Sequence, residues 1–275
     1  MVSTPSSRPV AYICRTCGVQ YAPSLESPAS CIICTDPRQY VGWGGQRWTS
    51  LEELRREGYT TEVRSLETDL FGIGTEPAMG IGQRGLLVRS AAGNVLWDVP
   101  GYVDQDAIDQ VHQLGGLGAI SASHPHFYGT IVEWAEAFDA PIFLPEADAA
   151  WVTRPDPKIR TYQNIVELVP GITLIRCGGH FDGSAVLHWA AGAEGRGALL
   201  TGDTITVVQD RDYVSFMWSY PNLVPLDRAG VRQVVERVEP YPFDRIYGGW
   251  WDRVVAADAR AAVQRSTERY LRFIG

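Results

Sequence analysis

The chain has 275 residues, 45% of them hydrophobic, and a formal net charge of −8 at pH 7. This length suffices for one sizeable domain and a small module, and the acidic balance argues against a nucleic-acid-binding protein, which usually carries a basic face. The first residues lack the apolar run of a signal peptide, and no segment approaches the ~20 apolar residues of a membrane span. We therefore expect a cytoplasmic protein with a small-molecule substrate and no nucleic-acid or membrane partner, and we leave open whether it forms a homo-oligomer.

Four of the five cysteines form two C-x2-C pairs with thirteen residues between them: Cys14, Cys17, Cys31 and Cys34. Each pair places two thiolates on one tight turn, and two such turns that face each other make a tetrahedral metal site. Disulfides are disfavoured in a cytoplasmic chain. We expect Zn²⁺ at this structural site; iron is the alternative, because the segment CRTCGVQY resembles the first half of a rubredoxin. Cys177 stands alone and is expected to be a buried thiol.

Helical and strand patterns follow the cysteine module. We expect the module, a zinc ribbon or rubredoxin-like knuckle, to occupy residues 1–46 and one larger domain to occupy residues 47–275. The segment SLEELRREG predicts a short helix over 50–58, and the glycine-rich segment 71–82 predicts a loop.

In the larger domain, segments with the apolar spacing of a helix alternate with segments typical of buried strands. Residues 106–116 predict a helix that ends at two glycines. Residues 130–138 predict another helix, with Thr130 and Glu133 in the pattern of a capping box. The other expected elements are strands at 85–90, 94–101, 117–123, 141–144, 172–176, 184–190 and 197–201, and helices at 227–238 and 253–273. This order predicts a layered α/β architecture.

Three histidines and one aspartate follow predicted strands. His124 and His126 come after the strand at 117–123, and residues i and i+2 of an extended segment point the same way. His180 lies in a glycine-rich loop and Asp203 in a tight turn, each after another strand. Functional side chains gather at such loop ends on a rigid scaffold. Three imidazoles and a carboxylate suit zinc or ferrous iron.

Residues 60–275 resemble the metallo-β-lactamase-fold metallohydrolases. That family carries H-x-H-x-D-H after one strand, another histidine in a glycine-containing loop, an aspartate in a G-D-T turn and a last histidine near the C-terminal end. His124, His126, His180 and Asp203 match four of these positions in order. The resemblance implies an αββα sandwich with the site at one edge of the two sheets, and the small zinc ribbon expected from the cysteine spacing precedes it.

The departures from the family pattern concern its second metal. Tyr128, Gly129 and Gly249 stand where the family has the ligands unique to that ion. The resemblance therefore implies one metal ion, Zn²⁺ or alternatively Fe²⁺, held by three histidines and by Asp203, unless Asp203 orients the attacking water instead. Tyr128 replaces a carboxylate, and as a phenol it could donate a hydrogen bond to a developing oxyanion. We expect Asp203 and Tyr128 to be the catalytic residues.

Two tryptophans lie beside the lost ligand. Trp250 and Trp251 are expected either to wall an apolar substrate pocket or simply to pack. The aromatic segment 215–225 is either a substrate lid or a cover for the core. His188 is expected to be a core residue and His112 to face solvent.

Three functions remain for a centre of this kind. The preferred one is a mononuclear metal-dependent hydrolase acting on a small ester, thioester, lactone or amide. The second is a ferrous-iron oxygenase, because the persulfide dioxygenases of the same family use two histidines and the aspartate for iron. The third is a metal-binding protein of this fold that has lost turnover.

Overall fold

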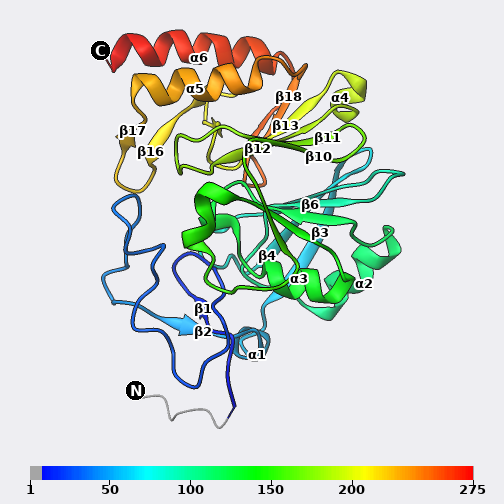
Figure 1. Cartoon of the computed structure of the whole chain (residues 1–275), viewed down its shortest axis with the longest axis vertical. Coiled ribbons are helices and arrows are strands. Elements are labelled where there is room, and N and C mark those ends of the chain that lie inside the picture. Colours follow the sequence, from blue (N-terminus) through cyan, green and yellow to red (C-terminus); the bar gives the residue numbers. More distant parts are fainter. Residues whose placement is uncertain (1–7, 275) are drawn as a thin grey trace.

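Two β-sheets lie face to face between two layers of helices in the computed structural model, which describes residues 8–274 (Figure 1). The first sheet has seven strands in sequence order, β3 to β9, and it changes from antiparallel to parallel pairing at β6 and β7. Its strands are β3 (Thr60–Glu67), β4 (Leu70–Glu76), β5 (Gly85–Val88), β6 (Val95–Trp97), β7 (Ala119–Ser121), β8 (Ile142–Pro145) and β9 (Ile159–Tyr162).

The second sheet has six strands in the order β10-β11-β12-β13-β18-β19. Within residues 8–274, its only parallel pair is β13 with β18. The strands are β10 (Ile165–Val169), β11 (Ile172–Arg176), β12 (Ala185–Trp189), β13 (Ala198–Leu200), β18 (Arg245–Tyr247) and β19 (Val254–Val255). Two short hairpins lie between β13 and β18 in the chain: β14 (Thr206–Val207) with β15 (Val214–Ser215), and β16 (Met217–Ser219) with β17 (Val224–Pro225).

Helices cover the outer face of each sheet. In Figure 1, α2 (Gln105–Gln113) and α3 (Ile131–Phe138) lie against the first sheet, and α5 (Arg228–Val238) and α6 (Ala259–Phe273) lie against the second. Between the sheets, buried side chains of both form one core, among them Leu86, Trp97, Leu187 and Leu200. Each fully buried large apolar side chain contributes roughly 1.5–3 kcal/mol. The predicted αββα sandwich is confirmed.

The cysteine module packs onto the outer face of the first sheet and shares its core. Its two short strands, β1 (Ile13–Cys14) and β2 (Trp48–Thr49), pair with each other, and α1 (Leu51–Arg56) follows directly. Cys17 and Ile33 belong to the same buried cluster as Ile73 of β4 and Ile120 of β7. The expected boundary at residue 46 falls inside this module, two residues before β2.

Most predicted elements are confirmed, with three corrections that have tertiary causes. The helices expected at 50–58, 106–116 and 130–138 are α1, α2 and α3. The segment expected to be a loop at 71–82 instead contains most of β4. The last helix begins at Ala259, because Val254–Val255, at the start of the expected helix, form β19 instead.

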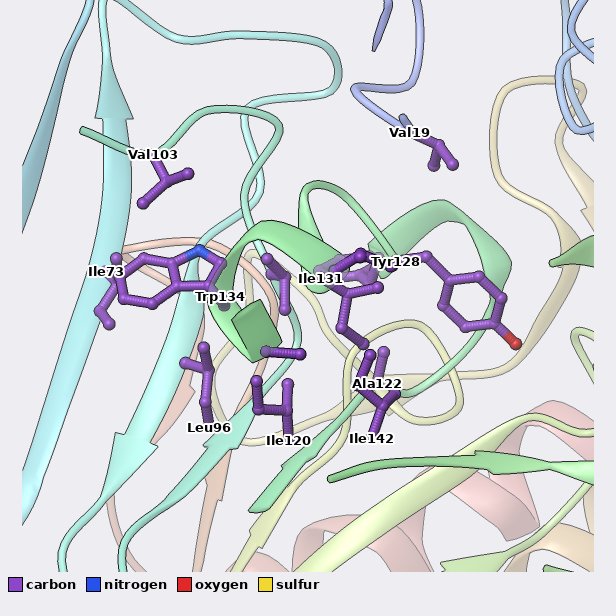
Figure 2. Packing of buried hydrophobic residues seen from close by; sticks show 14 of the residues in the cluster. Val19, Ile73, Leu96, Val103, Ile120, Ala122, Tyr128, Ile131, Trp134 and Ile142 are labelled. Carbon is purple, nitrogen blue, oxygen red and sulfur yellow. The ribbon is translucent and has the colours of Figure 1, made fainter. Parts of the chain in front are cut away.

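The third correction concerns the expected capping box of α3. The Thr130 hydroxyl donates to the carbonyl of Pro100 at 3.1 Å and makes no cap. Glu133 instead accepts from the Gln20 side chain at 2.9 Å and pairs with Arg154. Figure 2 shows Ile131 and Trp134 of this helix packed over Leu96 and Ile120. Contacts with the cysteine module and the sheet therefore replace the local cap.

No helix in residues 8–274 combines the length and the apolar character needed to cross a bilayer. Cys177 and His188 are buried as expected, and the ring of His188 bonds the carbonyl of Pro242 at 2.8 Å. His112 is exposed, also as expected.

The docking of the module onto the body requires a bare glycine pair. A Cβ at Gly101 would lie 2.9 Å from the Cα of Gly18. We expect Gly101→Ala to lower the free energy of unfolding by about 1–3 kcal/mol, because the added methyl overpacks this contact. Gly44→Ala is the matched control, since a Cβ there meets nothing within 4 Å. Chemical denaturation of both variants checks this, and an equal effect of the two substitutions would contradict it.

Candidate metal centre

Three histidine side chains converge between two loops of the sandwich. His124 and His126 follow β7, and His180 lies in the loop between β11 and β12. One nitrogen from each ring lies within 4.8 Å of the others, and all three residues are buried. The ring of Phe181 touches all three imidazoles, at 5.7, 5.2 and 5.1 Å between ring centroids. The structure therefore assembles the predicted histidines into one compact group.

Hydrogen bonds fix two of the rings and leave their other nitrogens unused. The hydroxyl of Ser123 lies 3.0 Å from His124 Nδ1, and His180 Nδ1 donates to the carbonyl of Met217 at 3.1 Å. Nε2 of both rings, and both nitrogens of His126, have no hydrogen-bond partner within residues 8–274. A buried polar atom left without a partner costs about 1–3 kcal/mol. This set of converging lone pairs therefore fits a metal ion.

Burial keeps these imidazoles neutral. It lowers the pKa of His180 to about 4, and it lowers the pKa values of His124 and His126 well below the ordinary value for histidine. Neutral imidazole is the form that binds a metal ion.

Asp203 lies beside the histidine group, in the turn after β13. Its Oδ2 is 3.5 Å from His124 Nε2, and its Oδ1 accepts from the Thr206 hydroxyl at 3.3 Å. Burial raises the pKa of Asp203 to about 7. Its oxygens lie outside the set of atoms within 4.8 Å of one another. The carboxylate thus lies beside the three histidines, and His124 is the histidine that it contacts.

An aromatic ring and backbone carbonyls fill the space at the two glycines that stand where the family has ligands of its second ion. A Cβ at Gly249 would lie 2.5 Å from Cζ of the Phe127 ring. At Gly129, where φ is +43°, a Cβ would lie 2.3 Å from the carbonyl oxygen of Val99. Neither position has room for an imidazole. The Phe127 ring itself packs against His124, with 4.9 Å between centroids, and against Trp250.

Tyr128, expected at the metal, lies elsewhere. It is buried beside Val19, Leu144 and Ile159, and Figure 2 shows its hydroxyl pointing away from Trp134 at the edge of that cluster. Burial raises the pKa of its phenol well above the ordinary value, and Asp148 adds to this. The 3₁₀ turn at Pro125–Phe127 rotates the chain, so that Phe127 contacts His124. The arrangement does not bring Tyr128 to the histidines.

Of the two tryptophans, Trp250 borders a cavity and Trp251 packs on a strand. Trp250 borders a cavity of about 460 Å³ together with Asp203, Tyr220 and Arg253. Trp251 packs instead on β4, where a Cβ at Gly72 or Gly74 would lie 2.5 or 2.6 Å from its ring. Of the two tryptophans, only Trp250 therefore borders this cavity, whose lining includes Asp203 and none of the three histidines. Tyr220, in the segment expected to be a lid or a core cover, donates to the backbone carbonyl of Asp203 at 2.8 Å.

The four cysteines of the N-terminal module form a second group suited to a metal ion. Their sulfur atoms lie within 4.8 Å of one another, and all four residues are buried. The Sγ–Sγ distances are 3.6 Å for Cys14 and Cys34 and 3.8 Å for Cys17 and Cys31, and none of the four is in a disulfide. A tetrahedron with metal–sulfur bonds of about 2.3 Å has edges of about 3.8 Å. The residues present thus fit one tetrahedral ion.

Sequence reasoning missed two residues, Asp98 and Arg38, whose hydrogen bonds hold the loops that carry the histidines. Asp98, directly after β6, accepts from the backbone N–H of Ser123 at 2.6 Å, and Ser123 in turn holds His124. Burial raises the pKa of Asp98 to about 8. Its position after an apolar strand was the available signal. It was also missed that Arg38 of the cysteine module donates to the backbone carbonyl of His180, at 3.2 Å.

Comparison with solved structures identifies the fold. The chain is similar to VMB-1, with a TM-score of 0.60 at 13% identity over 78% of this chain and 99% of that one. It is similar to the DIM-1 metallo-β-lactamase, with a TM-score of 0.56 at 15% identity over 78% and 99%. The metallo-β-lactamase SMB-1 gives 0.52 at 17% identity over 78% and 96%. The body of the chain has the metallo-β-lactamase fold.

The sequence also has a full-length relative. This chain is 49% identical over 263 residues to "Uncharacterized protein YmaE" of Bacillus subtilis (strain 168). The aligned region covers 95% of this chain and 96% of the relative. The chain belongs to the same protein family as YmaE. No model of a known protein family matches it.

Each of the two clusters should account for one metal equivalent per chain. We expect Cys17→Ser to remove one of two metal equivalents per chain, because three thiolates and a hydroxyl bind an ion far more weakly than four thiolates. We expect His124→Ala to remove the other equivalent, because it deletes one of three ligands. Plasma emission analysis of the purified variants checks this. Two equivalents in either variant would show that its cluster is not a metal site.

Removal of the Tyr128 hydroxyl should change little. We expect Tyr128→Phe to keep the metal content and to change the free energy of unfolding by at most about 1 kcal/mol, because the hydroxyl is buried with no hydrogen-bond partner in the part of the chain that the structure describes. Calorimetry and metal analysis check this. A loss of the histidine-site metal would restore Tyr128 to the metal centre.

Proposed function

We propose that the chain is a metal-dependent hydrolase with a single catalytic ion, held by His124, His126 and His180. The observation that carries this proposal is the set of unpaired, buried imidazole nitrogens within 4.8 Å of one another. Three neutral nitrogens with an open fourth position are the ligand set of catalytic zinc sites. The fold shared with metallo-β-lactamases is consistent with hydrolysis, although fold alone does not define a reaction.

The cavity beside Asp203 is the proposed binding site for the substrate. Its volume of about 460 Å³ lies in the range of small-molecule sites. The indole of Trp250 supplies an apolar wall, and the Trp250 Nε1 is fixed by donation to the carbonyl of Ile81 at 2.9 Å. We propose a small ester, thioester, lactone or amide as the substrate class. We also propose that the protein is cytoplasmic.

A divalent ion at the histidines would supply Lewis acidity, which activates water and polarises a carbonyl oxygen. The chain's own residues do the positioning. Ser123 and the carbonyl of Met217 hold two imidazole rings. Asp203, held by Thr206 and bordering the cavity, accepts a hydrogen bond from the attacking water and so orients it. Phe127 and Trp250 place two apolar rings in contact beside His124.

Zinc is the proposed ion at both clusters. Ferrous iron is the alternative at the histidines. Asp203 lies close enough to His124 to complete a set of two imidazoles and one carboxylate, which is typical of ferrous iron. A non-catalytic metal-binding protein is the remaining alternative. Metal analysis of protein purified from its native source decides between the ions.

We expect Asp203→Asn to lower kcat/KM on the best substrate of an ester, thioester, lactone and amide panel by about 10²–10⁴, the usual range for a group that manages the proton of the attacking water. Asp252→Asn is the matched control, because Asp252 borders the same cavity but is exposed. It should leave kcat/KM within about twofold. The hydrolase proposal would be overturned if zinc-loaded protein hydrolysed no member of the panel. It would also be overturned if iron-loaded protein consumed oxygen with a persulfide.

A further inference from the structure

A segment of the cysteine module reaches the histidine site from a distant part of the sequence. After Cys34, residues 37–39 are held against the hairpin of β16 and β17. The Ser219 hydroxyl donates to the carbonyl of Arg38 at 2.7 Å, and the Asn222 side chain donates to the carbonyls of Pro37 and Gln39 at 3.0 and 3.2 Å. Figure 1 shows the blue loop of the module meeting this hairpin.

The side chain of Arg38 extends from this segment toward the metal-ligand loop. Asp36 holds the guanidinium at two points, Nε to Oδ1 at 2.6 Å and Nη2 to Oδ2 at 3.0 Å. Nη1 donates to the backbone carbonyl of His180 at 3.2 Å. The guanidinium also lies over the ring of Phe181, 3.8 Å from its centroid. The side chains of Arg38 and Asp36 are only 14% and 11% exposed, so this contact is sheltered from solvent.

The two groups that Arg38 contacts are parts of the metal site itself. His180 supplies one ligand, and the Phe181 ring packs against all three imidazoles. On the other side, His180 is held by the carbonyl of Met217, which belongs to the same hairpin that clamps residues 37–39. The His180 ligand is therefore fixed between the hairpin and the guanidinium.

We propose that Arg38 is a positioning residue for the histidine metal site, and that through it the four-cysteine site controls the metal affinity of the histidine site. Only three residues separate Cys34 from Arg38. An ion bound by four cysteines fixes the 31–34 turn and thereby the start of the segment that carries Arg38. Without that ion the segment has fewer constraints, and the His180 loop loses its outer support. Because linkage is reciprocal, metal at either site favours metal at the other.

This inference rests on the proposed metal at the histidines, and its test is separable from that proposal. Full-length protein is prepared with zinc in the four-cysteine site and with the histidine site emptied by a chelator. Co²⁺ binding to the histidines is then measured by competition with a chelator, and the absorption spectrum of the bound Co²⁺ reports ligand geometry. If the wild-type histidines bind no Co²⁺, the proposed function fails, and the inference fails with it.

We expect Arg38→Ala to weaken Co²⁺ binding at the histidines by about 10–100-fold, the usual effect of losing a group that orients a ligand, and to change the Co²⁺ spectrum. The zinc of the cysteine site should be retained. Arg15→Ala is the matched control, because Arg15 belongs to the same module but pairs with Glu57 and Thr49. Wild-type affinity and spectrum in Arg38→Ala, or an equal loss in Arg15→Ala, would overturn the positioning role.

The coupling itself is measured with Cys34→Ser, which weakens metal binding at the cysteines. We expect this substitution to weaken the histidine site by a similar factor in the wild-type background and by much less in the Arg38→Ala background, because both changes remove the same support. Fully additive losses would show that the coupling does not pass through Arg38. If Cys34→Ser does not fold, the Arg38→Ala and Arg15→Ala pair still decides the positioning role.

Discussion

The proposal of a single ion at the histidine site depends on the packing of the Phe127 ring against the bare Cα of Gly249. A side chain at position 249 would overlap the ring, and a side chain at Gly129 would overlap two backbone carbonyls. Two divalent ions about 3.5–4 Å apart repel each other unless several anionic or strongly donating ligands compensate. On that side Asp203 offers a carboxylate, 3.5 Å from His124 Nε2, and Phe127 offers an apolar ring. This arrangement supports the proposal of a single ion at the histidines.

The same packing makes the site depend on parts of the chain far apart in sequence. The loop after β7 supplies two imidazoles, the β11–β12 loop supplies the third, and the β16–β17 hairpin and the cysteine module hold that third ligand in place. All three histidines are at most 2% exposed. Without an ion, this burial leaves several nitrogens unpaired, and that cost is what a bound metal removes. The proposed metal site and the docking of the module therefore share contacts at His180.

Local spacing predicted the members of each group that lie close in sequence, whereas His180 was predicted from its place in a strand-end loop and from the family pattern. The C-x2-C pairs and His124 with His126 are close in sequence, so short turns bring their donors together whatever the rest of the fold does. The orientation of Tyr128 could not be read in this way. Strand alternation ends at His124, and the 3₁₀ turn that follows places Phe127 at the site and turns Tyr128 toward Val19 and Leu144.

Other errors came from contacts that no local pattern reveals. The glycines of β4 suggested a loop, but two of them are required because the Trp251 ring lies on the strand. That packing also takes Trp251 away from the cavity, where it had been expected. Arg38 carries no motif, and its contact with His180 spans 142 positions. The αββα sandwich was predictable because the family pattern extends over the whole body, whereas these side-chain positions depend on the final packing of distant segments.

The most direct test of a one-ion centre is a crystal grown in millimolar zinc, with anomalous diffraction measured on both sides of the zinc absorption edge. The account predicts one anomalous peak among His124, His126, His180 and Asp203, one peak among the four cysteines, and an undisturbed Phe127 ring against Gly249. A second full-occupancy zinc peak within about 4 Å of the first, with the Phe127 ring displaced to admit it, would contradict the account.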